Sequence, residues 1–254
     1  MKGIELRDAR ARYGPLEALH GITLAAPAAT LTVLLGRNGS GRTTVLRALA
    51  GTIPLSEGAV LRDGRDITRH AAHERAAQGL CFVPDRQAVF SSLTVAENLE
   101  LCDVKGDFGH ALAVYPELRP LLPRRAGTLS GGEQRMLALS RALLSQALLT
   151  RAPLTPAPHS PTPHSPTAVI LVDEPTQGMS PTVAARTYTH LTDLATDQGA
   201  CVVVADQQLP PALRERASRT AVVVHELRRG TVAFSGEAAE FSPAPTPPSR
   251  RVPE

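Results

Sequence analysis

The sequence predicts an α/β fold built on a mainly parallel sheet. Three short apolar runs, at Leu31–Leu35, Val169–Val172 and Cys201–Val204, are continuous rather than alternating, as in strands covered on both faces. Segments with helical spacing separate these runs along the chain. By contrast, Ile4–Arg7 alternates between apolar and polar residues, which predicts a smaller antiparallel sheet beside the main one.

Composition narrows the class of protein further. The 254 residues carry a net charge of 27 − 24 = +3, too mild to indicate nucleic acid as a partner. No apolar run approaches the roughly 18–20 residues of a membrane helix, and the N-terminus lacks the apolar core of a signal peptide. Cys81, Cys102 and Cys201 are too few and too dispersed for a disulfide framework or a cysteine zinc site. We therefore expect a soluble cytoplasmic protein.

The N-terminal region predicts three strands and one helix. Ile22–Leu24 alternates like Ile4–Arg7, and Val60–Arg65 reads as a strand that ends in an Asp-Gly turn. The segment Thr43–Ala50 has helical spacing and is followed by Gly51, a residue typical of helix C-caps. These elements would form the antiparallel sheet and the helix that follows the first buried strand.

The middle of the chain predicts helices. Val95, Leu99 and Leu101 fall in one segment with helical periodicity, and a second such segment contains the apolar residues from Met136 to Leu144.

Half of the 22 prolines fall in two short stretches, residues 153–166 and 242–254. The first stretch repeats the unit Pro-His-Ser-Pro-Thr and is too polar to build a core, so we expect an exposed, disordered insert at about 150–167. Its two histidines are candidate metal ligands, but a solvated linker is the favoured interpretation. The same composition predicts a disordered tail at 242–254.

A glycine-rich loop follows the first buried strand and opens a helix, the context in which such loops hold phosphates. Its glycines allow successive N–H groups to point inward, and the Thr43 hydroxyl is placed to bind Mg²⁺. The alternative is a ligand-free turn between a strand and a helix. The candidate binding residues are Gly36, Asn38, Gly39, Ser40, Gly41, Arg42, Thr43 and Thr44.

Two further segments carry candidate chemistry. Asp173 and Glu174 end a buried strand, where Asp173 would hold Mg²⁺ and Glu174 would polarise an attacking water. An ordinary acidic strand end is the alternative. Ser130 and Glu133 fit a capping box, and the adjacent Gly131 and Gly132 predict a close approach of the backbone to phosphate.

These three segments, in this order, resemble those of the ATP-binding subunits of ABC transporters, over residues 1–240 outside the insert. Val83–Phe90, Leu93–Leu99 and Tyr115–Leu118 are similar to segments of the shorter ATPase subunit of importers for branched-chain amino acids, urea or amides. The resemblance implies a P-loop NTPase (RecA-like) core with a flanking antiparallel β subdomain. It also implies a helical signature subdomain at about 86–149, within one ATPase domain over 1–241.

The resemblance also implies roles for single residues. Tyr13 would stack on adenine, unless it is an ordinary half-buried strand aromatic. Asp85 stands where many members have a glutamine that senses Mg²⁺ and contacts the permease, and Gln207 stands where most have the switch histidine. Ser130, Gly131 and Gly132 would reach the γ-phosphate of ATP bound on a second ATPase subunit.

Arg42 stands where the family has lysine, an exchange that keeps the charge but changes its shape. The resemblance implies an ATPase, peripheral on the inner face of the cell membrane, that powers separate transmembrane permease subunits. One alternative is a degenerate subunit that binds ATP and hydrolyses it weakly or not at all. Another is a soluble ABC ATPase acting on nucleic acid, which usually carries two ATPase domains or a long coiled coil.

Overall fold

The computed structural model describes residues 2–86, 88–102, 108–151, 167–216 and 221–242. The predicted insert, apart from its edges, and the predicted tail, apart from residue 242, lie outside these ranges, so their disorder stays a prediction.

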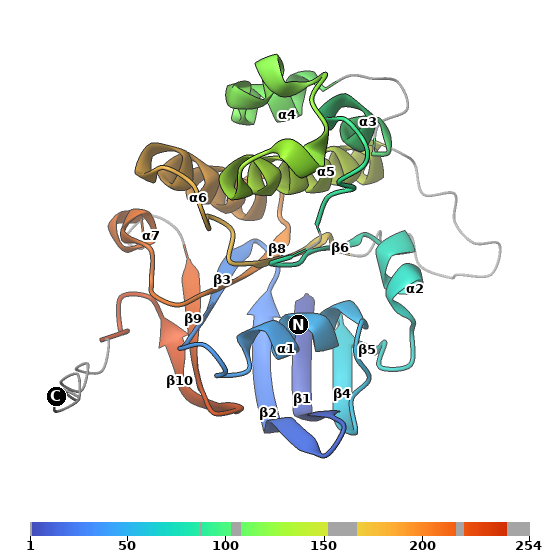
Figure 1. The fold of residues 1–254 in the computed structure, drawn as a ribbon. Helices are drawn as coiled ribbons and strands as arrows, with labels where there is room; N and C mark the ends of the chain where they lie inside the picture. The colour runs from blue at the N-terminus through green and yellow to red at the C-terminus, as the bar shows by residue number, and fades with distance from the viewer. Residues whose placement is uncertain (1, 87, 103–107, 152–166, 217–220, 243–254) are drawn as a thin grey trace, which may run out of the picture.

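The main sheet has six strands in the described part of the chain, and the five neighbours from β9 to β6 run parallel (Figure 1). Only β10 runs antiparallel to its neighbour. The prediction of a mainly parallel sheet is confirmed. In spatial order the strands are β10 (Thr231–Glu237), β9 (Val222–Arg228), β3 (Thr30–Leu35), β8 (Cys201–Asp206), β7 (Val169–Asp173) and β6 (Leu80–Val83).

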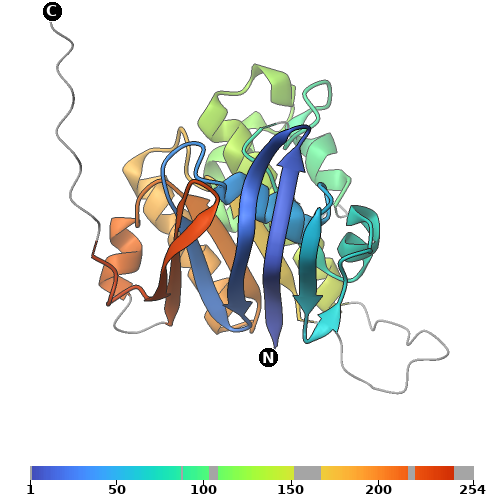
Figure 2. The same ribbon diagram turned by 90° about the horizontal axis from the view of Figure 1, so that it is seen from below.

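A second, antiparallel sheet flanks the first, as the alternating N-terminal segments predict (Figure 2). Asp63 and Gly64 link its two shortest strands with φ angles of 50° and 80°, the left-handed geometry that an Asp-Gly hairpin turn requires. In spatial order its strands are β2 (Leu16–Pro27), β1 (Gly3–Tyr13), β4 (Glu57–Arg62) and β5 (Arg65–Asp66).

Helix α1 (Arg42–Ala50) lies between the two sheets and contacts strands of both. It begins one residue earlier than predicted and ends before Gly51, whose φ of 75° forms the predicted C-cap. Val45 and Leu49 are fully buried in a core cluster with Leu171 of the main sheet. This packing fixes the start of α1, and with it the glycine loop, against the sheet.

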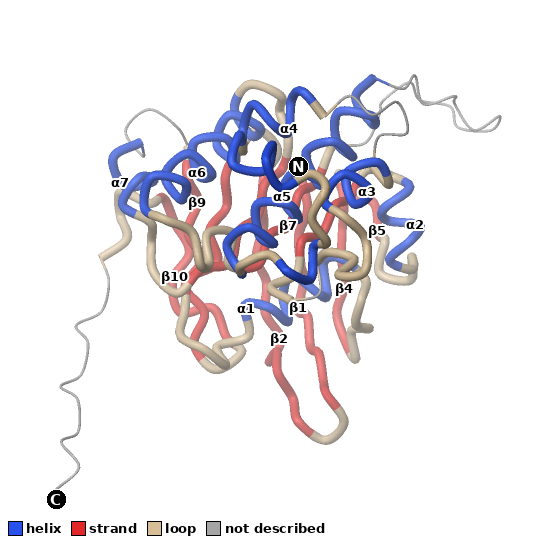
Figure 3. Tube along the Cα trace, turned by 45° about the horizontal axis from the view of Figure 1, so that its top comes forward, coloured by secondary structure: helices blue, strands red, loops and turns tan. Residues whose placement is uncertain are grey.

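The opposite face of the main sheet is covered by helices (Figures 1 and 3). Leu101 lies one residue beyond the end of α3 and is exposed, so the helix predicted for Val95, Leu99 and Leu101 contains only the first two. The helices and 3₁₀ turns are α2 (Ala72–Ala77), α3 (Val95–Glu100), α4 (Gly109–Val114), η1 (Pro116–Leu121), η2 (Ala126–Thr128), α5 (Gly131–Arg151), α6 (Pro181–Thr196) and α7 (Pro211–Arg216).

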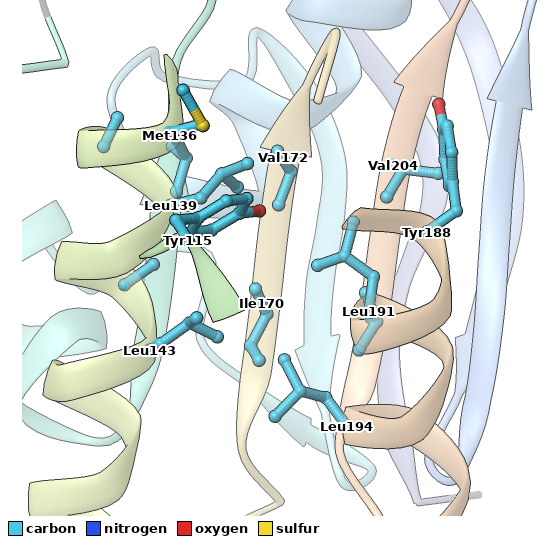
Figure 4. Close-up of a cluster of buried hydrophobic side chains, with 14 of the residues drawn as sticks. Tyr115, Met136, Leu139, Leu143, Ile170, Val172, Tyr188, Leu191, Leu194 and Val204 are labelled. Atoms are coloured by element: carbon cyan, nitrogen blue, oxygen red, sulfur yellow. The ribbon is translucent and has the colours of Figure 1, made fainter. Parts of the chain in front are cut away.

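Side chains from α5 and α6 converge on strand β7 (Figure 4). Ile170 and Val172 face these helices, whereas Val169 and Leu171 face α1 on the other side of the sheet. Because both faces are covered, every position of β7 is buried, which explains its continuous apolar sequence. Each such side chain contributes roughly 1.5–3 kcal/mol by burial, and together they hold the strand end that carries Asp173.

Candidate nucleotide-binding site

The parallel strands bring three predicted segments to one edge of the main sheet. Leu35, which ends β3, pairs with Asp206 at the end of β8, and Asp173 at the end of β7 pairs with Ala205. The glycine loop follows β3, Glu174 follows β7 and Gln207 follows β8. The carboxyl ends of parallel strands are where open α/β sheets bind ligands.

The glycine loop owes its path to residues without side chains. Gly36 has a φ of 152°, and a Cβ there would lie 2.5 Å from the Leu227 carbonyl oxygen. Gly41 is the N-cap of α1 with a φ of 107°, and Gly39 has a φ of 78° with open space around it. The loop therefore follows a path that would strain residues with side chains, and it leaves room above Gly39 for a ligand.

Arg42 points across the loop toward the acidic strand end. Its side chain is 6% exposed, with Nη2 lying 3.3 Å from Asn38 Oδ1 and 3.5 Å from Glu174 Oε1. Nη1 is buried without a hydrogen-bond partner among the described residues, and the same holds for Ser40 Oγ. A buried cation with a spare donor suits an anionic group such as phosphate.

Glu174 is held in an unusual backbone conformation with a φ of 47°. Left-handed geometry costs a residue with a side chain on the order of 1–3 kcal/mol, and such strain is common at functional sites. The Glu174 amide donates to the Ala205 carbonyl at 2.9 Å, and its Oε1 accepts from Gln207 Nε2 at 3.4 Å. The same oxygen therefore faces both Arg42 and Gln207.

Asp173 is 1% exposed, and burial raises the pKa of its carboxyl. The charges of Asp85 and Glu174 act in the same direction, whereas a hydrogen bond from Thr43 and the charge of Arg42 oppose them. Asp173 Oδ2 has no hydrogen-bond partner among the described residues. A buried acceptor of this kind, beside the Thr43 hydroxyl, fits a divalent cation.

No group of three or more His, Cys, Asp and Glu side chains in the described ranges is placed to hold a metal ion. A Mg²⁺ ion here would therefore complete its ligands with phosphate oxygens and water, as Mg²⁺ does in nucleotide sites. The residues present fit that arrangement. Asp85, the other predicted metal residue, is partly exposed and lies 3.7 Å from Arg86 Nε.

Tyr13 ends β1 and is 40% exposed, as a ring that stacks on a base must be. The next strand, β2, lies against the glycine loop, because a Cβ on Gly41 would be 3.1 Å from the Leu19 side chain. The structure thus places Tyr13 on the β1–β2 hairpin, which packs against the glycine loop.

The segment Ser130–Gly132 forms the predicted capping box at the start of α5. The Ser130 amide donates to Glu133 Oε2 at 2.7 Å, and the Glu133 amide donates to Ser130 Oγ at 3.3 Å. Among the described residues no hydrogen bond joins this segment to the glycine loop.

The structure shows a reason other than phosphate binding for a glycine at position 132. A Cβ on Gly132 would lie 2.3 Å from the Gly178 carbonyl oxygen, in the turn that follows Glu174. Gly131 is exposed, and a Cβ there would meet nothing within 4 Å. Gly131 is open to the close backbone approach that the sequence predicts, and a phosphate contact of Gly132 stays a prediction.

Three residues around the site, two of them buried, escape sequence analysis. Arg135 is 5% exposed and donates to the carbonyl oxygens of Pro84 and Asp173, joining the two acidic loops. Its burial lowers its pKa. Asp206 accepts the Gln207 amide at 2.6 Å, and Tyr188 donates its hydroxyl to Asp206. No local pattern marks Arg135 and Tyr188, because their partners lie 18 or more positions away in the sequence.

A glycine loop between a buried strand and a helix, facing an acidic strand end, defines the class of P-loop nucleotide-binding ATPases. The family model described as ABC transporter matches residues 19–150. The chain therefore belongs to the ABC transporter family, whose ATP-binding cassettes are ATPases, and the predictions of family, fold and enzyme class are confirmed.

Two similar curated proteins transport branched-chain amino acids by name. The probable transport ATP-binding protein LivF of Archaeoglobus fulgidus is 31% identical over 91% of this chain and 90% of its own. The high-affinity transport ATP-binding protein BraG of Pseudomonas aeruginosa is 29% identical over 80% and 81%. Among solved structures, a dimeric bacterial ABC transporter cassette shares the fold with a TM-score of 0.74 and 21% identity, over 94% of this chain and all of the other.

In the described ranges, no helix is both long and apolar enough to cross a bilayer.

Proposed function

We propose that this chain hydrolyses ATP to power separate transmembrane permease subunits that import branched-chain amino acids or similar small solutes. The observation that carries the proposal is the placement of Glu174 between Arg42 and Gln207, with its carboxylate facing the glycine loop. The names of the two similar transport proteins support the choice of solute.

In this proposal the loop residues from Gly36 to Thr44 bind the ATP phosphates, and Tyr13 stacks on adenine. Thr43 and Asp173 hold Mg²⁺, with Asp85 near enough to act on Asp173 electrostatically, and the ion supplies charge neutralisation at the phosphates. Glu174 polarises the attacking water. Gln207 holds the Glu174 carboxylate in place at 3.4 Å.

A second ATPase subunit, identical or different, completes the site. Ser130 and Gly131 are exposed at the positive end of α5, so this segment of the other subunit is available to bind the γ-phosphate. Closure of two subunits on ATP and their reopening after hydrolysis would drive the permease. The chain would then lie at the inner face of the membrane through its permease.

We assign the ATPase domain to residues 1–241, with the signature subdomain at about 86–149 and a tail at 242–254. In support, the described residues between β6 and β7 form helices and 3₁₀ turns and no strand. Co-purification of a permease and a second ATPase subunit from membranes tests the assembly. Purification of the chain alone from detergent-solubilised membranes would contradict it.

Turnover of ATP tests the catalytic assignment. We expect Glu174→Gln to lower kcat by about 10²–10³-fold, because it removes the group that polarises water, while ATP still binds. Nucleotide affinity measured with a fluorescent ATP analogue serves as the control. Equal, very low hydrolysis by the wild type and Glu174→Gln would show that the assignment is wrong.

The second candidate is a subunit that binds ATP but hydrolyses it weakly, as the regulatory half of a heterodimer. It is favoured by the contact of Arg42 with Glu174, which engages the carboxylate that hydrolysis needs. Arg42→Lys discriminates between the two. If the wild type binds ATP without turnover and Arg42→Lys gains turnover, the second candidate is correct.

A further inference from the structure

Strand β8 and helix α6 place a buried tyrosine behind Gln207. Tyr188 is 3% exposed, and its hydroxyl donates to Asp206 Oδ2. Figure 4 shows this hydroxyl directed toward the carboxyl end of the strand that carries Val204, the strand that ends at Asp206. The other carboxylate oxygen of Asp206 accepts the Gln207 amide at 2.6 Å.

The hydrogen bonds continue from Gln207 into the proposed site. Gln207 Nε2 lies 3.4 Å from Glu174 Oε1, so one path joins Tyr188, Asp206, Gln207 and Glu174. Tyr188 also forms a hydrogen bond with Thr176, in the turn that follows Glu174. One buried hydroxyl thus contacts both loops whose side chains meet at the carboxylate.

We propose that Tyr188 and Asp206 are positioning residues that set Gln207, and through it the Glu174 carboxylate, for ATP hydrolysis. This inference rests on the proposed role of Glu174. Asp206 fixes the Gln207 backbone, and Tyr188 fixes the Asp206 carboxylate from a helix anchored in the core. A displaced catalytic group lowers the rate without weakening substrate binding, because the phosphates are held by the glycine loop.

Tyr188 is suited to this task because it remains a donor. Burial, and then the negative charge of Asp206, raise the pKa of Tyr188 well above its ordinary value. Its hydroxyl stays protonated at physiological pH, so the hydrogen bond to Asp206 persists.

The test uses Tyr188→Phe, which removes only the hydroxyl. We expect kcat for ATP to fall roughly tenfold, with KM and the affinity for a fluorescent ATP analogue unchanged. In a Gln207→Ala background, the same substitution should cause no further loss, because the path is already broken. An unchanged kcat in Tyr188→Phe, or the same loss in both backgrounds, would overturn the positioning role.

Tyr115→Phe is the matched control for a lost buried hydroxyl. Tyr115 is 1% exposed, and its hydroxyl lies 3.0 Å from Thr187 Oγ1. Thr187 is on the same helix as Tyr188, but this hydrogen bond is not part of the path to Gln207. We expect both variants to lower Tm by a few degrees, with only Tyr188→Phe lowering kcat. An equal loss of kcat in Tyr115→Phe would indicate a merely structural effect and would overturn the proposal.

The outcomes for the two proposals are distinguishable. If Glu174→Gln abolishes turnover while Tyr188→Phe retains the wild-type kcat, the proposed function stands and the positioning role is overturned. If the wild type and Glu174→Gln are equally inactive, both are overturned.

Discussion

The two segments predicted to bind ATP differ in how far a single chain completes them. Around the glycine loop, the side chains of Arg42 and Gln207 both contact the carboxylate of Glu174, although they lie far from it in the sequence. At the start of α5, Ser130 is exposed and its hydroxyl accepts only the local bond of the capping box. The difference teaches that one half-site is a product of tertiary folding, whereas the other is an exposed helix start, which in the proposed function a second subunit would complete.

The contact between Gly132 and Gly178 joins the two half-sites, and breaking it should have the largest effect. In Gly132→Ala the new Cβ would lie 2.3 Å from a backbone oxygen, so α5 or the turn must shift. We expect the free energy of unfolding to fall by about 1–3 kcal/mol, and Tm to fall by roughly 2–12 °C in thermal melts. Gly131→Ala, with open space around it, should leave Tm nearly unchanged. An equal fall in the two variants would refute the contact.

The exposed half-site should matter only when two subunits meet. In a Glu174→Gln background that retains ATP, Ser130→Ala should weaken ATP-dependent dimerisation roughly tenfold by losing a hydrogen bond to a charged phosphate. Sedimentation measures this, and the affinity of the monomer for ATP should not change. Thr94→Ala removes the same kind of helix cap on α3 and is the control. Equal dimerisation of all three proteins would show that Ser130 does not contact the nucleotide.

The stability of the sheet beside the glycine loop should depend on pH through His225. His225 pairs with Leu34 near the end of β3, and burial lowers the pKa of its ring despite a hydrogen bond with the Ala25 carbonyl. Below about pH 6.5 the unfolded chain binds a proton that the folded chain resists, so stability falls as pH falls.

Thermal melts between pH 7.5 and 5.5 test this response. We expect a loss of less than about 1.4 kcal/mol per pH unit from His225, and a shallower decline in His225→Gln. His190, whose pKa burial also lowers, should preserve part of the decline. The same slope in the variant and the wild type would exclude His225 as a source.

Features encoded locally could be predicted from the sequence. Gly51 ends α1 because a left-handed C-cap favours glycine, and Ser130 with Glu133 starts α5 through side chains three residues apart. The turn at Asp63 and Gly64 follows from the same local chemistry. In each case the residues that decide the conformation lie next to one another in the chain.

Contacts between distant residues could not be predicted. The direction of the Arg42 side chain depends on Glu174, which lies 132 positions away, and the bond from Tyr188 to Asp206 depends on how α6 lies against β8. Gly132 shows the same limit, because the sequence suggests phosphate binding as the reason for this glycine and does not reveal that Gly178 lies beside it. Spacing predicts which residues form a site, but not which of them already contact each other.

The Asp63 carboxylate accepts three hydrogen bonds, from the Gly3 amide and from the amide and hydroxyl of Thr167. Arg62 donates to the Thr167 carbonyl, so the residue that leads into β7 is tied to the antiparallel sheet. Ala168 and four residues of β7 separate this tie from Asp173, a distance of roughly 20 Å along the strand. Tension on the chain before Thr167 would act on these hydrogen bonds rather than on the strand end that carries Asp173. A reporter group attached just before β7 should therefore disturb Asp173 little while ATP turnover is followed.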